Sequence, residues 1–372
     1  MEKDNYKILV LFVEPMRYGL DRIKEVYERS PYTFKYVYCE QRVTGKEDLN
    51  LPADSIVCTG TNFDKKKQFI SVIKDFKPDF CIINGYVGTV QTVAIKYCQK
   101  HGIRYAIESD TPLNIPKNKI KRLLKKIYLK RMLSNRYCYG FPGGSLQKEN
   151  FIFYGIPEEK NYIMPMSVSL DRLNKEEIKL PSKEKLKQEL GILNKITFLF
   201  VGRLEHVKNV SLLLKAFSML KKNNDNVALI IVGDGTLKTE LEEQVRDSGV
   251  QDVYFKGYIT FPEIVRYYKA SDVFVLPSVF EPWGLVVNEA MTLGLPAVVS
   301  SDVGCRKDLI ETGNNGYIFE SDNVYDLLEK LESIIELDIA SASRFAVNKI
   351  SQWNYNYYLK VFLGAIEDVK QS

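Results

Sequence analysis

The chain has 372 residues, a length that suits two domains of roughly 150 to 200 residues better than one core. Its hydrophobic fraction of 45% and charged fraction of 27% are ordinary for globular proteins and exclude wholesale disorder. The apolar runs have the length of strands, well short of the roughly 18 to 20 residues that a transmembrane helix needs. The N-terminus has no signal-peptide pattern, so we expect a cytoplasmic protein.

The net charge of +5 is unevenly distributed. Residues 1–140 contain 26 Lys/Arg and 15 Asp/Glu, whereas the remaining residues contain 26 and 32. This asymmetry predicts that the first domain meets an anionic surface. The six cysteines are scattered without a CxxC spacing, which favours buried free thiols. The chain has only two histidines, His101 and His206, so we expect no metal site.

Short strand-like runs alternate with helical patterns along the whole chain. In the first half, strands are predicted at 7–13, 34–38, 54–59, 79–83, 104–108 and 162–167, with helices at 64–76 and 88–100. In the second half, strands are predicted at 196–202, 227–233, 253–258, 273–278 and 296–300, with helices at 209–222, 236–248, 262–269 and 285–293. Because strands alternating with helices form parallel sheets, we expect an α/β fold of two Rossmann-like domains facing each other across a cleft.

The domain boundary is predicted in the least apolar part of the chain. Residues 171–192 are highly charged, contain Pro181 and separate the two series of strands. We therefore expect a first domain at 1–170, a linker at 171–192 and a second domain at 193–350. The aromatic segment 351–372 is expected to form a helix that crosses back to the first domain.

The strongest chemical signal lies in residues 281–300, EPWGLVVNEAMTLGLPAVVS. Gly284 permits close approach of the backbone to a ligand. The backbone amides of Leu285 and Val286, at the start of the helix that follows, would face a phosphate. Glu289 lies about 6 Å further along that helix, so Glu281 and Glu289 could hold two polyhydroxylated groups of one ligand. The alternative is a pair of solvated glutamates.

Two further motifs precede this one in the sequence. FLFVGRLEHVKN contains a strand followed by GR-x4-K, and ALIIVGDGT contains a strand followed by G-x-G. Together with the E-x7-E pattern of Glu281 and Glu289, they resemble family 4 of the retaining GT-B glycosyltransferases. The resemblance implies that the second domain, at 193–350, binds a nucleotide-diphosphate sugar donor, UDP- or GDP-linked. It also implies that the first domain, at 1–170, binds a saccharide or lipid-linked acceptor in cell-surface glycan synthesis. It also implies that no metal cofactor is needed.

The resemblance assigns roles to individual residues. It places Arg203 and Lys208 on the donor diphosphate, Glu281 on the donor sugar and Glu289 on the ribose. A planar guanidinium and a compact ammonium suit a pyrophosphate leaving group, which agrees with this assignment. The remaining donor-site candidates are backbone positions near the phosphates and the base, namely Gly202, Gly233, Gly257, Tyr258, Gly284, Leu285 and Val286.

Other enzyme classes fit the sequence less well. Lys238 stands where a dinucleotide fingerprint beginning at Gly233 would have its third glycine, which argues against a nicotinamide oxidoreductase. A GT-B sugar-nucleotide epimerase and a non-catalytic partner subunit remain as alternatives.

The first domain departs from the family at the end of the strand 104–108. Many members carry a histidine there, whereas this chain has Glu108 and Asp110. These two residues are candidates for an acceptor-side role, and a turn or capping function is the alternative.

Residues 116–136 contain nine Lys/Arg and no acidic residue. At helical spacing, Ile120, Leu123, Leu124 and Ile127 fall on one face, which is typical of a helix at a membrane interface. The candidate lipid-binding cations are Lys121, Arg122, Lys125 and Lys126, on a protein that would be peripheral to the inner face of the membrane. The alternative is a solvated basic helix that packs its apolar stripe on its own domain. No recognised nucleic-acid-binding motif accompanies the charge, so we expect no nucleic-acid partner.

Overall fold

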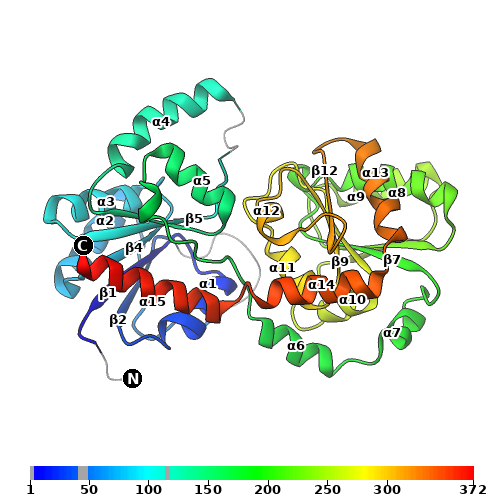
Figure 1. Cartoon of the computed structure of the whole chain (residues 1–372), viewed down its shortest axis with the longest axis horizontal. Coiled ribbons are helices and arrows are strands. Elements are labelled where there is room, and N and C mark those ends of the chain that lie inside the picture. The colour runs from blue at the N-terminus through cyan, green and yellow to red at the C-terminus, as the bar shows by residue number, and fades with distance from the viewer. Residues whose placement is uncertain (1–3, 41–48, 114–117) are drawn as a thin grey trace. The chain divides into compact units, whose positions relative to one another are not determined.

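The computed structural model describes residues 4–40, 49–113 and 118–372, which form two compact units. The first unit comprises Met1–Ser167 and Asn354–Ser372, and the second comprises Val168–Trp353. Each unit contains one six-stranded parallel sheet with helices on its faces (Figure 1).

The strands of the first unit are β1 (Lys7–Phe12), β2 (Thr33–Tyr38), β3 (Ile56–Val57), β4 (Phe80–Asn84), β5 (Arg104–Ser109) and β6 (Cys138–Pro142). Its helices are α1 (Arg17–Arg22), the π-helical turn η1 (Ile23–Tyr27), α2 (Asn62–Phe76), α3 (Thr89–His101), α4 (Lys119–Leu133), α5 (Ser145–Tyr154), the 3-10 turn η2 (Glu158–Lys160) and α15 (Tyr355–Gln371). The strand order is β3-β2-β1-β4-β5-β6. The connections therefore change direction between β1 and β4, which form the switch point of this sheet.

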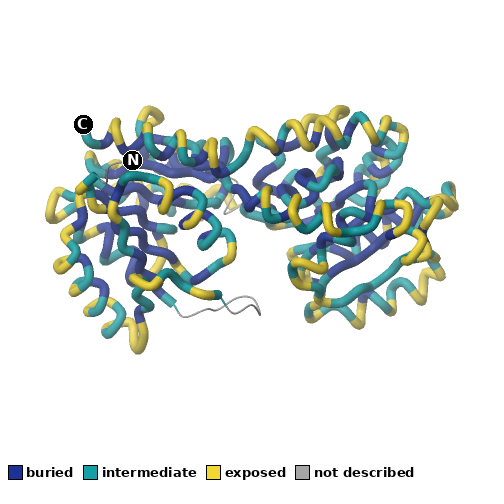
Figure 2. The backbone as a smooth tube through the Cα atoms, turned by 90° about the horizontal axis from the view of Figure 1, so that it is seen from below, coloured by how far each residue is buried: buried dark blue, intermediate teal, exposed yellow. Residues whose placement is uncertain are grey.

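Alternation along β1 divides the first unit's core between the two faces of the sheet. Leu9 and Leu11 pack with residues of α2, α3, α4 and α5, whereas Ile8, Val10 and Phe12 pack with η1 and α15. The side-chain period of two in a strand produces this division. The C-terminal helix α15 thus lies in the core of the first unit, and the buried strands are visible as dark segments in Figure 2.

The strands of the second unit are β7 (Ile196–Val201), β8 (Val227–Val232), β9 (Val253–Gly257), β10 (Val273–Leu276), β11 (Ala297–Ser300) and β12 (Gly316–Phe319). Its helices are α6 (Leu170–Ile178), α7 (Lys183–Glu189), the 3-10 turn η3 (His206–Lys208), α8 (Val210–Asn223), α9 (Lys238–Ser248), α10 (Val265–Ala270), α11 (Leu285–Thr292), α12 (Arg306–Leu309), α13 (Val324–Glu336) and α14 (Ile339–Ser351). The order β12-β11-β10-β7-β8-β9 places the switch point between β7 and β10.

Two sequence expectations differ from the structure. The segment 171–192, expected as a linker, lies in the second unit and forms most of α6 and all of α7, because Leu173 and Leu186 are buried among its charged residues. The segment 162–167, expected as a strand, is irregular, and β6 at Cys138–Pro142 is the sixth strand of the first sheet.

Candidate functional site

The second unit brings the predicted donor residues to the carboxyl end of its sheet. The loop after β7 contains Arg203 and Lys208, and the loop after β10 contains Glu281. Because β7 and β10 are neighbours at the switch point, both loops emerge at the same crevice. A backbone hydrogen bond of 3.0 Å from the Val279 amide to the Val207 carbonyl joins them.

Lys208 and Glu281 contact each other directly in this crevice. The ammonium of Lys208 donates a hydrogen bond to Oε2 of Glu281, and the two side chains are only 16% and 14% exposed. Two residues that lie 73 positions apart in the sequence therefore form one ion pair. Each partner neutralises the charge of the other.

The backbone around Glu281 is held in place by the segment that follows β11. The Glu281 amide donates to the Asp302 carbonyl at 3.3 Å, and the Gly304 amide donates to the Glu281 carbonyl at 2.9 Å. Two residues further on, Trp283 is buried, stacks on Trp353 with ring centroids 5.6 Å apart, and donates from Nε1 to Asn288 at 2.9 Å. These contacts fix the direction in which Glu281 leaves the loop.

Gly284 is the N-cap of α11, and its φ of +99° lies in the left-handed region. A Cβ at this position would lie 3.1 Å from the Leu276 side chain and 3.3 Å from that of Val303, so both conformation and space favour glycine. The helix begins at Leu285, as predicted, and the backbone amides of Leu285 and Val286 lie in its first turn. The positive end of the helix dipole is therefore beside Glu281.

The loops that follow β7 and β8 contact each other closely at their glycines. The Gly202 amide donates to the Val232 carbonyl at 3.0 Å, and the Gly233 amide donates to the Gly257 carbonyl at 2.8 Å. A Cβ on Gly233 would overlap the carbonyl of Gly202, and one on Gly235 would overlap the backbone of Leu204. The loops after β7 and β8 therefore approach more closely than any other residue type would allow.

Glu289 lies on α11 and accepts a hydrogen bond of 2.8 Å from the hydroxyl of Tyr268 to its Oε2. Tyr268 is a fully buried residue of α10. Burial, together with the nearby Glu289 carboxylate, raises the pKa of Tyr268 well above its ordinary value. No motif in the sequence indicated that Tyr268 would contact Glu289.

Arg203 and Tyr258 are exposed at the same end of the sheet. Next to Arg203, the carboxylate of Glu205 accepts hydrogen bonds from the Thr236 amide at 3.2 Å and from its hydroxyl at 2.8 Å. These bonds, with a smaller contribution from the Arg203 charge, hold the pKa of Glu205 below its ordinary value. Arg203 thus lies on a loop that Glu205 ties to the segment after β8.

The first unit places Glu108 in a buried cluster. Its carboxylate accepts hydrogen bonds from Arg22, from Asn84 at 3.2 Å and from the Tyr358 hydroxyl at 3.1 Å. Glu108 and Arg22 are 5% and 3% exposed, and the guanidinium also lies over the rings of Phe12, Tyr27 and Tyr358. This arrangement gives Glu108 a structural role in joining β5 to α1 and α15.

A pocket of about 160 Å³ lies at the switch point of the first sheet. Its lining includes Glu14 in the loop between β1 and α1, Tyr18 in α1, Tyr38 at the end of β2 and Asn84 at the end of β4. Burial and then the Asp110 carboxylate raise the pKa of Tyr18, which lines this pocket. The backbone carbonyl of Asp110 accepts from Gln147 at 3.1 Å.

The basic segment forms α4. The alternative expectation was that the apolar stripe of this helix packs on its own domain, and the structure differs from it. The apolar stripe is exposed: Ile120, Leu123, Leu124 and Ile127 are 57% to 72% exposed. Lys125 instead lies 5.3 Å and 5.0 Å from the ring centroids of Tyr86 and Tyr154, and Lys126 lies 4.1 Å from that of Phe153. Lys121 is exposed and Arg122 is half-buried. Residues 116 and 117 of the predicted segment lie outside the described residues.

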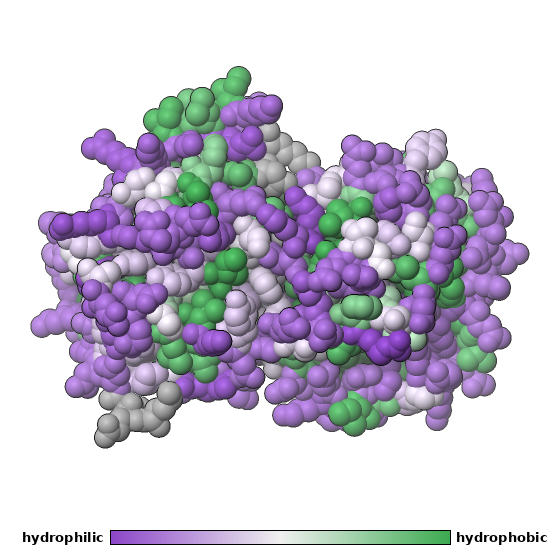
Figure 3. Space-filling view, in the orientation of Figure 1, coloured by the Kyte–Doolittle hydropathy of each residue, from purple (hydrophilic) through white to green (hydrophobic). Residues whose placement is uncertain are grey.

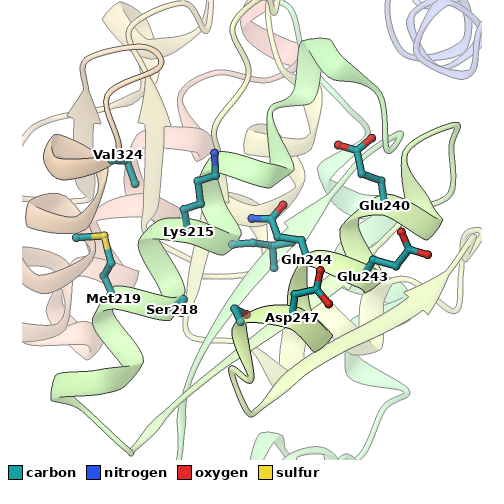
Figure 4. A pocket seen from close by; sticks show the side chains of 10 residues that line it. Lys215, Ser218, Met219, Glu240, Glu243, Gln244, Asp247 and Val324 are labelled. Carbon is teal, nitrogen blue, oxygen red and sulfur yellow. The ribbon is translucent and has the colours of Figure 1, made fainter.

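A larger groove of about 780 Å³ lies between α8 and α9 of the second unit (Figure 4). Lys215 of α8 lies on one side, and Glu240, Glu243 and Asp247 of α9 lie on the other. Its lining consists of residues on these two helices together with Val324, and so it is separate from the glycine loops and from the Lys208–Glu281 pair.

Residues 4–40, 49–113 and 118–372 have two properties that concern metal binding and membrane insertion. These residues contain no group of three or more His, Cys, Asp or Glu side chains placed to bind a metal ion. None of their helices is long and apolar enough to cross a bilayer. All six cysteines are buried free thiols, as predicted.

The second unit is similar in sequence to known proteins. Residues 182–352 match the family model described as glycosyl transferases group 1. The alpha-monoglucosyldiacylglycerol synthase of Streptococcus pneumoniae is 34% identical over 147 residues, which are 39% of this chain and 33% of the relative. Across the first three curated relatives, the match spans 33% to 47% of the relative's length.

Solved structures resemble the whole chain at low sequence identity. The structure of Anabaena HepE in complex with UDP and glucose has a TM-score of 0.73 at 19% identity and covers 98% of this chain and 100% of that one. Sucrose-phosphate synthase from Thermosynechococcus elongatus has a TM-score of 0.76 at 14% identity and covers 99% and 100%. The expected fold class, two Rossmann-like domains of the GT-B type, is confirmed.

Proposed function

We propose that this chain, whose second unit is a group 1 glycosyltransferase domain on a GT-B fold, is a retaining glycosyltransferase that uses a nucleotide-diphosphate sugar. The observation that carries the proposal is the meeting of Lys208, Glu281 and the first turn of α11 at the switch point of the second sheet. The UDP and glucose bound by HepE support a nucleotide sugar, UDP- or GDP-linked, as the donor.

The proposed diphosphate site combines three sources of positive charge. Lys208 supplies an ammonium, Arg203 supplies a planar set of donors, and the amides of Leu285 and Val286 supply the positive end of a helix dipole. Charge on the leaving diphosphate increases as the glycosidic bond breaks, so these groups bind the transition state more strongly than the ground state. They make a divalent metal unnecessary in this proposal.

The two glutamates divide the rest of the donor between them. Glu281, on the loop beside Lys208, would accept hydrogen bonds from hydroxyls of the transferred sugar, and Glu289, further along α11, would accept from the ribose. Gly257 ends β9 and Tyr258 follows it, and both would border the base. The strands β7 and β8 lie between β9 and β10. Gly202 and Gly233 would let the backbone approach the diphosphate closely.

The first unit would receive the acceptor, a saccharide or a lipid-linked saccharide of a cell-surface glycan. The pocket beside Tyr18, Tyr38 and Asn84 has the volume of a cavity that accommodates a single six-membered ring, about 150 Å³. Asp110, near Tyr18, is the acceptor-side candidate that fits this proposal, whereas the carboxylate of Glu108 is engaged in a buried ion pair. The lipid-glucosylating activity in the name of the Streptococcus pneumoniae relative is a precedent for a lipid acceptor.

The outward face of α4 would hold the protein on the inner face of the membrane. Hydrophobic side chains gather over α4 in Figure 3, and they are the exposed residues Ile120, Leu123, Leu124 and Ile127. Burial of a large aliphatic side chain is worth about 1.5 to 3 kcal/mol, whereas exposed cations add about 1 kcal/mol each near anionic lipid. The apolar ridge would therefore contribute more to membrane binding than Lys121 does.

A donor screen tests the enzymatic proposal. The full chain is incubated with UDP-, GDP- and ADP-sugars and a panel of saccharide and lipid-linked acceptors, and the product is followed by mass spectrometry and proton NMR. We expect transfer from a UDP- or GDP-sugar with retention of the anomeric configuration. Conversion of the sugar nucleotide without an acceptor would favour an epimerase, and binding without turnover of any donor would favour a non-catalytic partner subunit.

A further inference from the structure

We propose that Tyr268 is a positioning residue that fixes the carboxylate of Glu289 for binding the ribose of the donor. The inference rests on the proposed function, in which Glu289 contacts the ribose. It adds a residue that no motif of the sequence contains. The observation behind it is the 2.8 Å hydrogen bond from the Tyr268 hydroxyl to Oε2 of Glu289.

The surroundings of Tyr268 hold it in place, so it can orient the flexible side chain of Glu289. It is fully buried, and its ring packs on Phe274 of β10 with the centroids 6.1 Å apart. A glutamate has three side-chain torsions, and ordering such a side chain at the moment of binding costs conformational entropy. A hydrogen bond to one carboxylate oxygen orders the side chain before the ligand binds, which reduces this entropic cost. The other carboxylate oxygen is then already oriented for the ligand.

In the pair of Tyr268 and Glu289, the hydroxyl donates the hydrogen bond and the carboxylate accepts it. Burial and the adjacent Glu289 carboxylate raise the pKa of Tyr268, so its hydroxyl stays protonated at neutral pH and donates. A hydroxyl that donates to a carboxylate forms a charge-assisted bond, which is stronger than a bond between neutral groups. Carboxylate oxygens accept hydrogen bonds, so Glu289 can also accept them from the hydroxyls of a ribose.

A purely structural role for the same bond makes a different prediction. If the bond only satisfies a buried hydroxyl, its loss should change the stability of the second unit and should affect every ligand equally. If it positions Glu289, its loss should weaken only those ligands that offer ribose hydroxyls. The two roles are separated by removing the hydroxyl on the protein and the hydroxyls on the ligand in turn.

The experiment measures dissociation constants by calorimetry on the full chain. Wild type, Tyr268→Phe, Glu289→Gln and the double variant are titrated with UDP and GDP, and with the 2′,3′-dideoxy analogue of whichever binds. Tyr267→Phe is the matched control, because Tyr267 is the adjacent buried tyrosine and its charged neighbours are Arg266 and Glu263. Denaturant unfolding of each variant gives its stability.

We expect Tyr268→Phe to weaken binding of the ribonucleotide about 5- to 10-fold, as loss of a hydrogen bond to a charged group predicts. It should leave the dideoxy analogue unchanged and add nothing to Glu289→Gln, and Tyr267→Phe should bind as wild type does. Unchanged ribonucleotide affinity in Tyr268→Phe, or an equal loss for both ligands, would overturn the inference. If the wild type binds neither nucleotide, the proposed function itself fails, and the inference fails with it.

Discussion

Lys208 and Glu281 neutralise each other in a site that we propose for a dianionic diphosphate and a sugar. A donor that occupies the site must therefore take Lys208 from Glu281. The diphosphate would then attract the ammonium, and the sugar hydroxyls would donate to the released carboxylate. The ion pair couples recognition of the two parts of the donor.

This coupling predicts opposite effects of Glu281→Gln on binding and on turnover. Removal of the negative charge frees Lys208 for a diphosphate, so free UDP or GDP should bind roughly 3- to 10-fold more tightly, about 1 kcal/mol. Transfer should fall, because the sugar loses its carboxylate acceptor. Calorimetry with the nucleotide and turnover of the sugar nucleotide measure the two effects. Glu240→Gln on α9 is the charge-matched control, and weaker nucleotide binding in Glu281→Gln would contradict the coupling.

Arg203→Ala should reduce turnover by about 10²-fold, or about 2.7 kcal/mol, with little change in stability. The reason is that Arg203 is exposed on its loop and is not part of the core. Steady-state kinetics with a saturating acceptor and thermal unfolding measure the two quantities. Lys215→Ala, in the groove between α8 and α9, removes a positive charge away from the proposed site and serves as the control. Near wild-type turnover of Arg203→Ala would remove Arg203 from the diphosphate site.

Gly233→Ala should destabilise the second unit by about 3 kcal/mol or more, because the new Cβ would overlap the carbonyl of Gly202. Gly249→Ala is the matched control: Gly249 also has a positive φ, of +64°, but its Cβ would meet nothing within 4 Å. The control should cost only the backbone strain of roughly 1 to 2 kcal/mol. Urea unfolding compares the two variants. Equal losses would show that the close approach of the two loops is not what requires glycine at position 233.

Sequence patterns predicted the sheets well where a strand is a continuous apolar run, as in β1, β7 and β8. They missed β6, because Gly140 and Pro142 interrupt its apolar pattern, although Cys138–Pro142 is buried throughout. They also predicted a linker where the structure has α6 and α7, because one buried leucine in each helix is a weak signal among many charged residues.

Local sequence patterns did not predict contacts between residues that lie far apart in the sequence. The motifs identified Glu281 and Lys208 separately, but their ion pair depends on the order of strands in the sheet. Arg22 and Glu108 lie 86 residues apart, so the sequence did not reveal that Glu108 is part of a buried ion pair. For α4, the apolar stripe was correctly located, but a pattern of spacing does not say whether that stripe faces the core or the solvent.

The structural role of Glu108 leads to a contrast with Asp110. Glu108→Gln leaves the buried guanidinium of Arg22 without its negative partner and should destabilise the first unit by about 3 to 5 kcal/mol. Asp110→Asn should leave stability nearly unchanged and raise the KM for the acceptor, because Asp110 lies near the pocket beside Tyr18. Denaturant unfolding and acceptor kinetics separate the two variants. If Asp110→Asn leaves the acceptor KM unchanged, Asp110 is not an acceptor residue.

The apolar side chains of α4 are already exposed in the folded protein. The double variant Leu124→Gln/Ile127→Gln should therefore fold normally and lose binding to vesicles of phosphatidylcholine and phosphatidylglycerol by about 10²-fold or more, at roughly 1.5 to 3 kcal/mol for each side chain. Lys121→Gln should weaken binding by less, and mainly at low salt. Ile178→Gln is the control, because Ile178 is an isoleucine of the second unit that is 80% exposed. Vesicle flotation measures binding, and either a wild type that does not float or a double variant that floats equally well would exclude α4 as the membrane-binding surface.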